Sequence, residues 1–253
     1  MNGGVSTHIQ FGGFVETLGN SLNTDYLKTA GFVHTHLAGV SSDTLDGDWQ
    51  GFAASWSNLR PDTYMADGGK YRYRRYSEFS VEGTTGTAEL LPHVAYMQEK
   101  TVNHLNGGID RMYEPFEGGV VKSSSLASVF GTASQYLEAV RPGRTWKAQC
   151  FQNRILTSQN EVGQPAPEGM HRDGVDYVLT LFVDRVGADG GESSVYLSSD
   201  RSMLASTQLS EPGEYLFVDD HKLLHDVTGL SLKAGHDQGY RDVLIAMFTA
   251  TSA

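Results

Sequence analysis

Short apolar runs, each bounded by glycine, proline, asparagine or aspartate, dominate the chain from Thr145 onward. Runs of this length that are rich in β-branched and aromatic residues are typical of strands. Several are too continuously apolar for a sheet that faces water on one side, so a two-sheet jelly roll or a closed barrel is expected. This β-core should cover roughly residues 145–250, with strands at residues 145–156, 175–186, 193–199, 213–220 and 240–250.

The first half of the chain has a different pattern. Residues 71–81 alternate aromatic and polar side chains, which predicts one strand. Residues 123–140 place apolar side chains at helical spacing, with serines at the start as N-caps and Pro142-Gly143 as the stop signal. Residues 8–40 are expected to hold one or two short helices. Their candidate core contacts are Phe14, Leu18, Leu22 and Leu27.

The chain shows no internal repeat, charge block or low-complexity linker. Glycine pairs are spread along it like turns rather than gathered into a hinge. We therefore expect one domain over residues 1–253, mainly β with flanking helices, in which an α-rich N-terminal portion precedes the β-core.

Charge and cysteine content limit the classes of partner. The formal net charge is −11, and such an acidic surface repels nucleic acid and anionic lipid, although a local arginine can still bind an anionic small molecule. Cys150 is the only cysteine, which excludes an internal disulfide. The N-terminus does not resemble a signal peptide, and no apolar run reaches the roughly 20 residues of a membrane helix. A soluble, cytoplasmic protein is expected; its oligomeric state cannot be inferred.

The segment around His171 carries the strongest chemical signal. His171 and Asp173 stand at i and i+2, which on a strand places both side chains on one face. His225, 52 residues after Asp173, supplies a third ligand. Two histidines and one carboxylate leave coordination positions open, as in non-haem Fe(II) oxygenases, whereas a closed zinc site needs a further Cys or His. The alternative is an unrelated His and Asp on a surface turn before Gly174.

Arg241 opens the last apolar strand and is the second candidate for a functional role. If Arg241 shares a face with Val243, Ile245 and Met247, its guanidinium lies inside the mouth of the barrel. A buried arginine needs an anionic partner, and a carboxylate fits its fork. The alternative is an edge arginine paired with Asp242 or Asp219.

The order H-x-D, distal H, then R on a late strand resembles the 2-oxoglutarate/Fe(II) dioxygenase superfamily. The flanking stretches are similar to a narrower branch, the bacterial free-amino-acid hydroxylases of the L-isoleucine 4-hydroxylase type. The resemblance covers roughly residues 50 to 250. The matching stretches are Arg72-Tyr73-Arg74-Arg75-Tyr76, Gln152-Asn153-Arg154-Ile155, residues 165–177, Gly190-Gly191-Glu192, and Phe217-Val218-Asp219-Asp220 leading to His225.

The resemblance implies a double-stranded β-helix core and assigns roles to the candidate residues. His171, Asp173 and His225 would bind Fe(II), and Arg241 would bind the distal carboxylate of 2-oxoglutarate, with O₂ as co-substrate and ascorbate as a helpful reductant. His225 is preferred over His221 because the H-D-V-T pattern that follows it matches the family. Related halogenases carry Gly or Ala in place of Asp173, so this carboxylate favours hydroxylation.

The implied substrate is a small molecule: an aliphatic or otherwise apolar L-amino acid, hydroxylated on an unactivated side-chain carbon with release of succinate and CO₂. Glu168 or Asp176 could hold its ammonium group. Branch members often have a histidine where this chain has Phe151, which points to a reshaped pocket. The candidates for the substrate carboxylate are Arg74, Arg75 and Arg154, and those for an apolar wall are Tyr76, Phe151 and Trp146.

Other readings of the sequence remain open. The arginines of residues 72–76 could lie on a solvated strand face. The same cofactor chemistry could act on a modified or non-amino-acid small molecule in natural-product biosynthesis. A cupin-type dioxygenase without a co-substrate would have no need for a buried Arg241. A non-enzymatic jelly-roll binding module with a residual metal site is disfavoured by the presence of His171, Asp173, His225 and Arg241 together.

Overall fold

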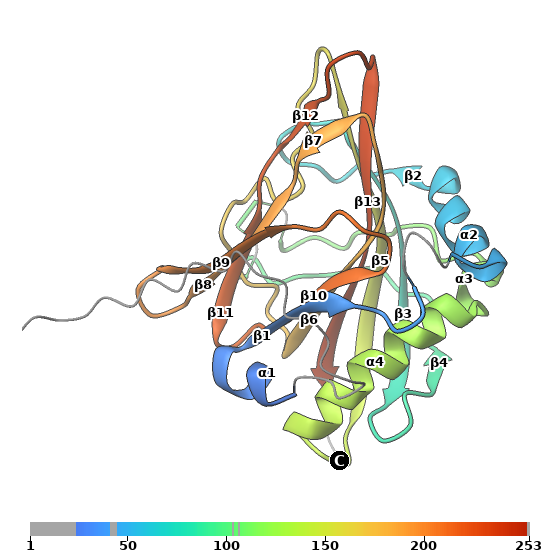
Figure 1. Cartoon of the computed structure of the whole chain (residues 1–253), viewed down its shortest axis with the longest axis vertical. Coiled ribbons are helices and arrows are strands. Elements are labelled where there is room, and N and C mark those ends of the chain that lie inside the picture. Colours follow the sequence, from blue (N-terminus) through green and yellow to red (C-terminus); the bar gives the residue numbers. More distant parts are fainter. Residues whose placement is uncertain (1–23, 41–44, 103, 106, 252–253) are drawn as a thin grey trace, which may run out of the picture.

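An antiparallel eight-stranded sheet forms the centre of the computed structural model, which describes residues 24–40, 45–102, 104–105 and 107–251. Its strand order is β1-β10-β6-β13-β5-β3-β2, with β4 paired to β3 (Figure 1). The strands are β1 Phe32–His36, β2 Arg60–Pro61, β3 Arg72–Glu82, β4 Ala88–Leu90, β5 Thr145–Ser158, β6 Tyr177–Val186, β10 Glu214–Asp219 and β13 Gln238–Ala250.

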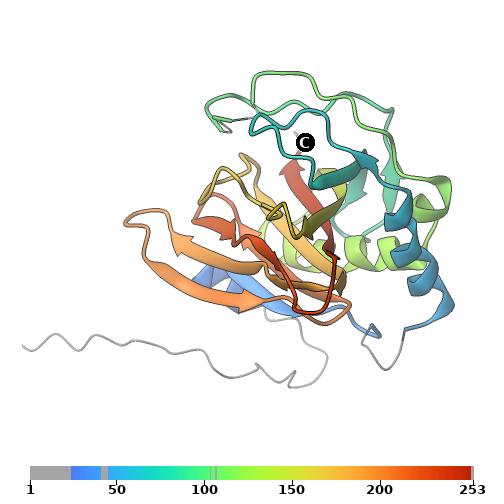
Figure 2. The same ribbon diagram turned by 90° about the horizontal axis from the view of Figure 1, so that it is seen from above.

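Two smaller antiparallel sheets complete the mainly β, jelly-roll fold. One has the order β11-β8-β9 and the other pairs β12 with β7. In Figures 1 and 2 the strands β8, β9 and β11 lie on the opposite side of the molecule from the helices α2 and α4. These strands are β7 Ala188–Gly190, β8 Glu192–Leu197, β9 Met203–Gln208, β11 Leu223–Val227 and β12 Leu230–Leu232.

The helices cover one face of the large sheet. They are α1 Thr24–Ala30, α2 Gly47–Ala54, α3 Gly118–Val121 and α4 Ser124–Val140, with a 3-10 turn η1 at Ser55–Asn58. The main apolar core lies between this face and the helices, where Phe130 and Leu137 of α4 pack in one cluster with Phe248 of β13 and Trp146 of β5. Since side chains alternate along a strand, the neighbouring positions of β5 and β13 point to the other face.

The longest predicted helix is confirmed. The Ser123 side chain accepts a hydrogen bond from the backbone N–H of Leu126 and so acts as the N-cap, and the helix ends at Val140, just before Pro142-Gly143. All five predicted strands of the β-core are present, within a few residues of the expected bounds.

The N-terminal expectation holds only in part. Leu27 lies in α1 and is 1% exposed, as a core contact should be. Residues 32–36, however, form β1 at the edge of the large sheet instead of a helix, because their backbone pairs with β10. Phe14, Leu18 and Leu22 lie outside the described residues. The single domain over residues 1–253 stays a prediction.

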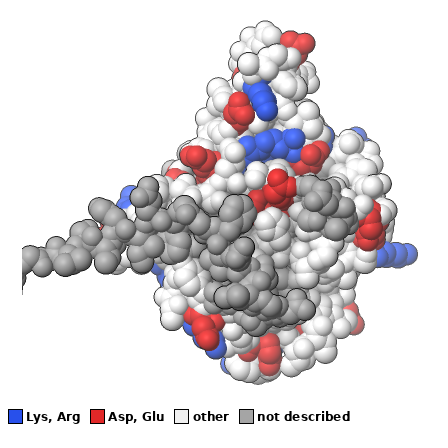
Figure 3. All heavy atoms as spheres, in the orientation of Figure 1, with Lys and Arg blue, Asp and Glu red and all other residues white. Residues whose placement is uncertain are grey.

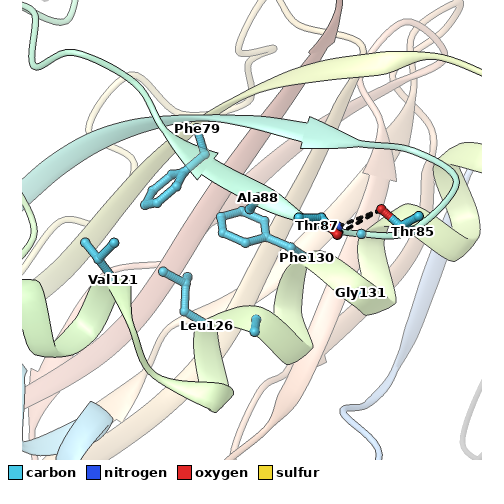
Figure 4. Close-up of a pocket in the computed structure, with 10 residues that line it drawn as sticks. Phe79, Thr85, Thr87, Ala88, Val121, Leu126, Phe130 and Gly131 are labelled. Atoms are coloured by element: carbon cyan, nitrogen blue, oxygen red, sulfur yellow. Dashed lines mark hydrogen bonds between the residues drawn. The ribbon is translucent and has the colours of Figure 1, made fainter.

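The charges on the surface are mixed, and one cavity lies beside α4. On the part of the face in Figure 3 that the structure describes, basic and acidic side chains are interspersed. Among the described residues, no helix has the length and apolar character to cross a membrane. A cavity of about 430 Å³ lies between α4 and the β3–β4 hairpin, and apolar residues, glycines and two threonines line it (Figure 4).

Candidate metal centre

The backbones of His171 and His225 pair directly. His225 lies in β11, and His171 lies in an irregular segment that forms an isolated antiparallel bridge with it. The N–H of His171 donates to the His225 carbonyl at 2.9 Å, and the N–H of His225 donates to the His171 carbonyl at 3.0 Å. This bridge places the two imidazole rings side by side, with centroids 4.5 Å apart.

Asp173 completes the cluster. Its Oδ2 lies 3.2 Å from His225 Nε2, and its Oδ1 lies 3.9 Å from His171 Nε2. One ligand atom from each of the three residues lies within 4.8 Å of the others, an arrangement that can surround one ion. The three side chains keep only 14–17% of their exposure, so the site is enclosed but reachable.

A backbone carbonyl favours the tautomer of His171 that leaves Nε2 free for a metal ion. Its Nδ1 lies 2.7 Å from the carbonyl oxygen of Gly169, so Nδ1 carries the proton and donates it to this bond. The Nε2 lone pair is then free to face an ion. A second partner that orients a histidine ligand in this way is typical of metal sites.

Asp220 fixes the segment that carries Asp173. Its carboxylate is 1% exposed and accepts the backbone N–H groups of Asp173 at 3.1 Å, Gly174 at 2.8 Å and Val175 at 3.1 Å. Gly174 has a φ of +78°, which is strained for other residues, and lets the chain turn around this carboxylate. The sequence indicated no role for Asp220, because its contacts are made across 45–47 residues of chain.

The charges of the site influence one another. Burial opposes ionisation of Asp173, but the hydrogen bond from His225 and the charges of His171 and Arg74 still lower the pKa of its carboxyl. Burial likewise opposes the charge on His225, yet Asp173 raises the pKa of that imidazole above its usual range. Burial first, and the neighbouring Asp173 second, raise the pKa of Asp220.

The structure distinguishes His225 from His221 as the candidate metal ligand. The His221 side chain is 62% exposed, and its Nε2 is 2.7 Å from Oδ1 of Asp176 instead of facing Asp173. Asp176 also binds Arg141 at 3.0 Å and accepts the N–H of Ala250. Asp176 is therefore occupied by protein partners and is not available for a substrate ammonium.

Arg241 is buried without an acidic partner at its Nε and Nη2. The residue is 2% exposed, and both nitrogens lack a hydrogen-bond partner among the described residues. Burial and then the charge of Arg185 lower its pKa to about 9. The edge pairing considered above does not occur, because Asp242 instead binds Arg154 with two bonds of 2.6 and 2.7 Å.

Gly191 makes room for Arg241. A Cβ at this glycine would lie 3.0 Å from Cδ of Arg241 and 2.8 Å from Leu230, and its φ of +70° also favours glycine. A buried guanidinium with unused donors is stable only with an anion beside it. A carboxylate ligand such as the distal end of 2-oxoglutarate fits these donors.

Strand alternation divides the six candidate substrate residues into two groups. Tyr76 and Phe151 pair across β3 and β5 and lie in an apolar cluster with Val175, close to Asp173. The Arg74 guanidinium lies 4.8 Å above the Phe151 ring, and its Nε is 3.3 Å from Asp62 but not aligned for a hydrogen bond. Arg74, Tyr76 and Phe151 therefore share the face that looks toward the triad.

The other three residues point away from it, contrary to the expectation from sequence. Arg75 binds the carbonyls of Pro115 and Asn58 beside the helices, because it alternates with Arg74 along β3. Arg154 is held by Asp242 on the same helix-side face of the sheet. Trp146 is fully buried in the core under α4.

A cavity of about 480 Å³ opens at the candidate metal centre. His171 forms part of its wall, together with Glu168, Met170 and Leu224. Arg172 and Arg201 also line it, and neither makes an ion pair with a described residue. The remaining lining residues are Thr101, Val102, His104 and Gly174.

The fold and this site agree with a comparison of family profiles. Residues 53–247 match the family described as 2OG-Fe dioxygenase, so the chain belongs to that family. Its cofactors are Fe(II), 2-oxoglutarate and O₂, in keeping with the His-Asp-His cluster. A search of curated proteins finds no match.

Solved structures show the same architecture. A bsmA homologue from Methylobium petroleophilum PM1 is 30% identical, with a TM-score of 0.78 over 89% of this chain and 91% of that one. IDO from Bacillus thuringiensis is 16% identical, with a TM-score of 0.72 over 90% and 94%. The Fe(II)/α-ketoglutarate-dependent dioxygenase TqaL is 14% identical, with a TM-score of 0.61 over 89% and 84%. The last two similarities concern the fold alone.

Proposed function

We propose that His171, Asp173 and His225 hold the Fe(II), that Arg241 binds the distal carboxylate of 2-oxoglutarate, and that the enzyme hydroxylates a free apolar L-amino acid. The observation that carries the cofactor assignment is the buried Arg241. Its Nε and Nη2 have no partner, and no acidic side chain among the described residues forms an ion pair with it. A cupin-type enzyme without a co-substrate would have no use for such a group.

The chain's own residues prepare the site for this chemistry. Bound Fe(II) with 2-oxoglutarate and O₂ supplies the oxidation, in which 2-oxoglutarate yields succinate and CO₂ and one oxygen atom enters the substrate. The Gly169 carbonyl keeps the proton of His171 on Nδ1. The lowered pKa of Asp173 keeps its carboxylate ionised as a ligand. Gly191 lies close against the Arg241 side chain, and Arg241 is 2% exposed, so the pairing of its guanidinium is shielded from water.

The proposed substrate class rests on Arg74 and the aromatic cluster beside it. The charge of Arg74 reaches Asp173, so a carboxylate bound there would lie close to the metal centre. Phe151 and Tyr76 have ring centroids 4.7 Å apart and make this face apolar, although they are only 4% and 0% exposed. The Tyr76 hydroxyl is engaged with Glu78 and Gln149. The resemblance to free-amino-acid hydroxylases supports the same class.

A screen tests this substrate class. The protein is incubated with Fe(II), ascorbate, 2-oxoglutarate and each proteinogenic amino acid, and products are examined for a mass increase of about 16 and for stimulated succinate release, as expected for insertion of one oxygen atom. We expect hydroxylation of one or more apolar amino acids. If every free amino acid fails while an N-acylated, carrier-bound or peptide substrate is oxidised, the proposed substrate class is wrong.

One observation favours a second candidate substrate. Arg172 and Arg201 line the cavity beside His171 without an ion pair to a described residue, and Nε of Arg172 is buried without a partner. A modified small molecule that carries a further anionic group would suit this rim. The N-acylated and carrier-bound arms of the screen cover this possibility.

A further inference from the structure

We propose that Glu168 binds the ammonium group of the substrate and thereby selects amine-bearing molecules. The proposal rests on the function proposed above, and it assigns a residue to the ammonium group of the substrate. Asp176, the other acidic candidate from the sequence, is already bound to Arg141 and His221.

Glu168 lies beside His171 in the wall of the cavity. Its Oε1 is 3.8 Å from His171 Nε2, the nitrogen left free to face the metal. It lines the same cavity as His171 and Met170. A cation bound to this carboxylate would therefore be held next to the metal centre, where the orientation of the substrate decides which carbon is attacked.

The carboxylate is buried but incompletely satisfied. The Glu168 side chain keeps only 13% of its exposure, and Oε2 is buried without a hydrogen-bond partner among the described residues. No lysine or arginine of the described chain lies within ion-pair distance of it, and the nearby Arg172 instead donates to the His221 carbonyl. A buried carboxylate in this condition is destabilising unless a ligand supplies the missing positive donor.

Asp220 shows what a structural carboxylate in this region looks like. Its oxygens accept three backbone N–H groups of the segment after His171, so its burial is explained by the fold. Among the described residues, Glu168 makes no comparable bond with the backbone, and it is not part of the group of three side chains that can surround one ion. The contrast indicates a carboxylate kept for a ligand.

Glu168 and Arg74 together provide opposite charges at the metal centre. Glu168 lies beside His171, and Arg74 lies near enough to Asp173 to influence its ionisation. An α-amino acid carries one positive and one negative group on the same carbon, so two such residues can fix its orientation. The apolar side chain is then left to the aromatic face around Phe151.

The test measures binding of three probes to the anaerobic Fe(II)–2-oxoglutarate form of the protein by calorimetry. L-Leucine carries both charges, 4-methylpentanoate lacks the ammonium, and 3-methylbutylamine lacks the carboxylate. Glu168→Gln keeps the shape but removes the charge, and Glu89→Gln makes the same change at an exposed position of β4 as a control. Affinity for 2-oxoglutarate is measured in each variant, as a readout that is independent of the substrate.

We expect wild type and Glu89→Gln to bind L-leucine more tightly than 4-methylpentanoate. Glu168→Gln should weaken L-leucine by about 10- to 100-fold, the loss expected for a hydrogen bond to a charged group, and leave 4-methylpentanoate and 2-oxoglutarate unchanged. Equal affinity of L-leucine for Glu168→Gln and wild type would overturn the proposal but not the function. A parallel loss of 2-oxoglutarate binding would also overturn it, by placing Glu168 in the cofactor site.

The amine probe distinguishes the role of Glu168 from the proposed free-amino-acid substrate. If 3-methylbutylamine binds in a Glu168-dependent way while L-leucine does not bind, the role of Glu168 stands and L-leucine is not a substrate. If neither amine-bearing probe binds to the wild type, the role of Glu168 is wrong, and the amino-acid screen decides the substrate class separately.

Discussion

His171 and His225 are joined by two reciprocal backbone hydrogen bonds, although 54 residues separate them in the chain. Their relative position is therefore set by the protein backbone. Asp173 is fixed to the same frame through the contact of its N–H with Asp220. A site organised in this way should keep its shape when a ligand side chain is changed.

The first prediction follows from that frame. Asp173→Ala should abolish Fe(II)-dependent turnover and weaken Fe(II) binding while leaving the fold intact, because the side chain faces the two histidines and its N–H bond to Asp220 remains. Turnover, Fe(II) titration and circular dichroism measure the three properties, and Asp110→Ala at an exposed position is the control. Near-normal hydroxylation by Asp173→Ala would show that the ligand set is wrong.

Arg241 gives the second prediction. Arg241→Ala should raise the dissociation constant of 2-oxoglutarate by the equivalent of about 2 to 5 kcal/mol, since one partner of a buried charge pair is lost. Fe(II) affinity should change much less. Calorimetric titration with 2-oxoglutarate checks this, with Arg60→Ala of the exposed strand β2 as the control. An unchanged dissociation constant would move the role to another residue.

The third prediction concerns Asp220 as a positioning residue. Asp220→Asn retains one acceptor oxygen for the three N–H groups around Asp173, so the ligand should be held less firmly. Partners that orient a metal ligand typically change affinity by about 10- to 100-fold, and we expect a loss of Fe(II) affinity in that range. Asp219→Asn is the matched control, because its carboxylate accepts the N–H groups of His221 and Lys222 instead. Equal Fe(II) affinity in both variants would contradict the assignment.

The fourth prediction is a pH dependence of stability at the start of α4. Asp48 accepts the N–H groups of Ser124 and Ser125, and the side-chain bond with Ser125, foremost, lowers its pKa from 3.8 to about 2. A lowered carboxyl pKa contributes stability that is present above pH 3.8 and is lost as the pH falls toward 2. The free energy of unfolding of Asp48→Asn should therefore decline less than that of wild type between these pH values.

Urea unfolding at several pH values between 2 and 5 measures this difference. Asp110→Asn, at an exposed position, should follow the wild-type curve. Parallel curves for wild type and Asp48→Asn would show that the contact of Asp48 with Ser124 and Ser125 does not stabilise the protein.

The sequence was sufficient for features that depend on local spacing. The apolar periodicity of residues 123–140 follows from the geometry of one segment. His171 and Asp173 also lie together, as their i, i+2 spacing suggested, but they do so on an irregular segment and not on the expected strand. Alternation along β3 also requires Arg74 and Arg75 to face opposite ways. Which of the two faces the triad is decided by the helices packed on the other side of the sheet, and no local pattern contains that information.

Features that depend on distant contacts were missed. The positioning role of Asp220 could not be predicted from the sequence, because its partners are the backbone groups of residues 173–175. The sequence predicts a helical region where the structure has strand β1. The strand forms because its pairing with β10 outweighs the local preference of these residues. Trp146 is a large apolar residue of the kind that can line a pocket, yet its position on β5 places it in the core under α4.

The most direct test of the cofactor assignment is an anaerobic titration of the Fe(II)-loaded protein with 2-oxoglutarate, followed by visible absorption. We expect wild type to develop the weak violet charge-transfer band of the 2-oxoglutarate chelate, Asp173→Ala to show no such band, and Arg241→Ala to require far more 2-oxoglutarate for the same intensity. A wild-type protein that binds no Fe(II), or that binds it without ever producing the band, would contradict the assignment of His171, Asp173, His225 and Arg241.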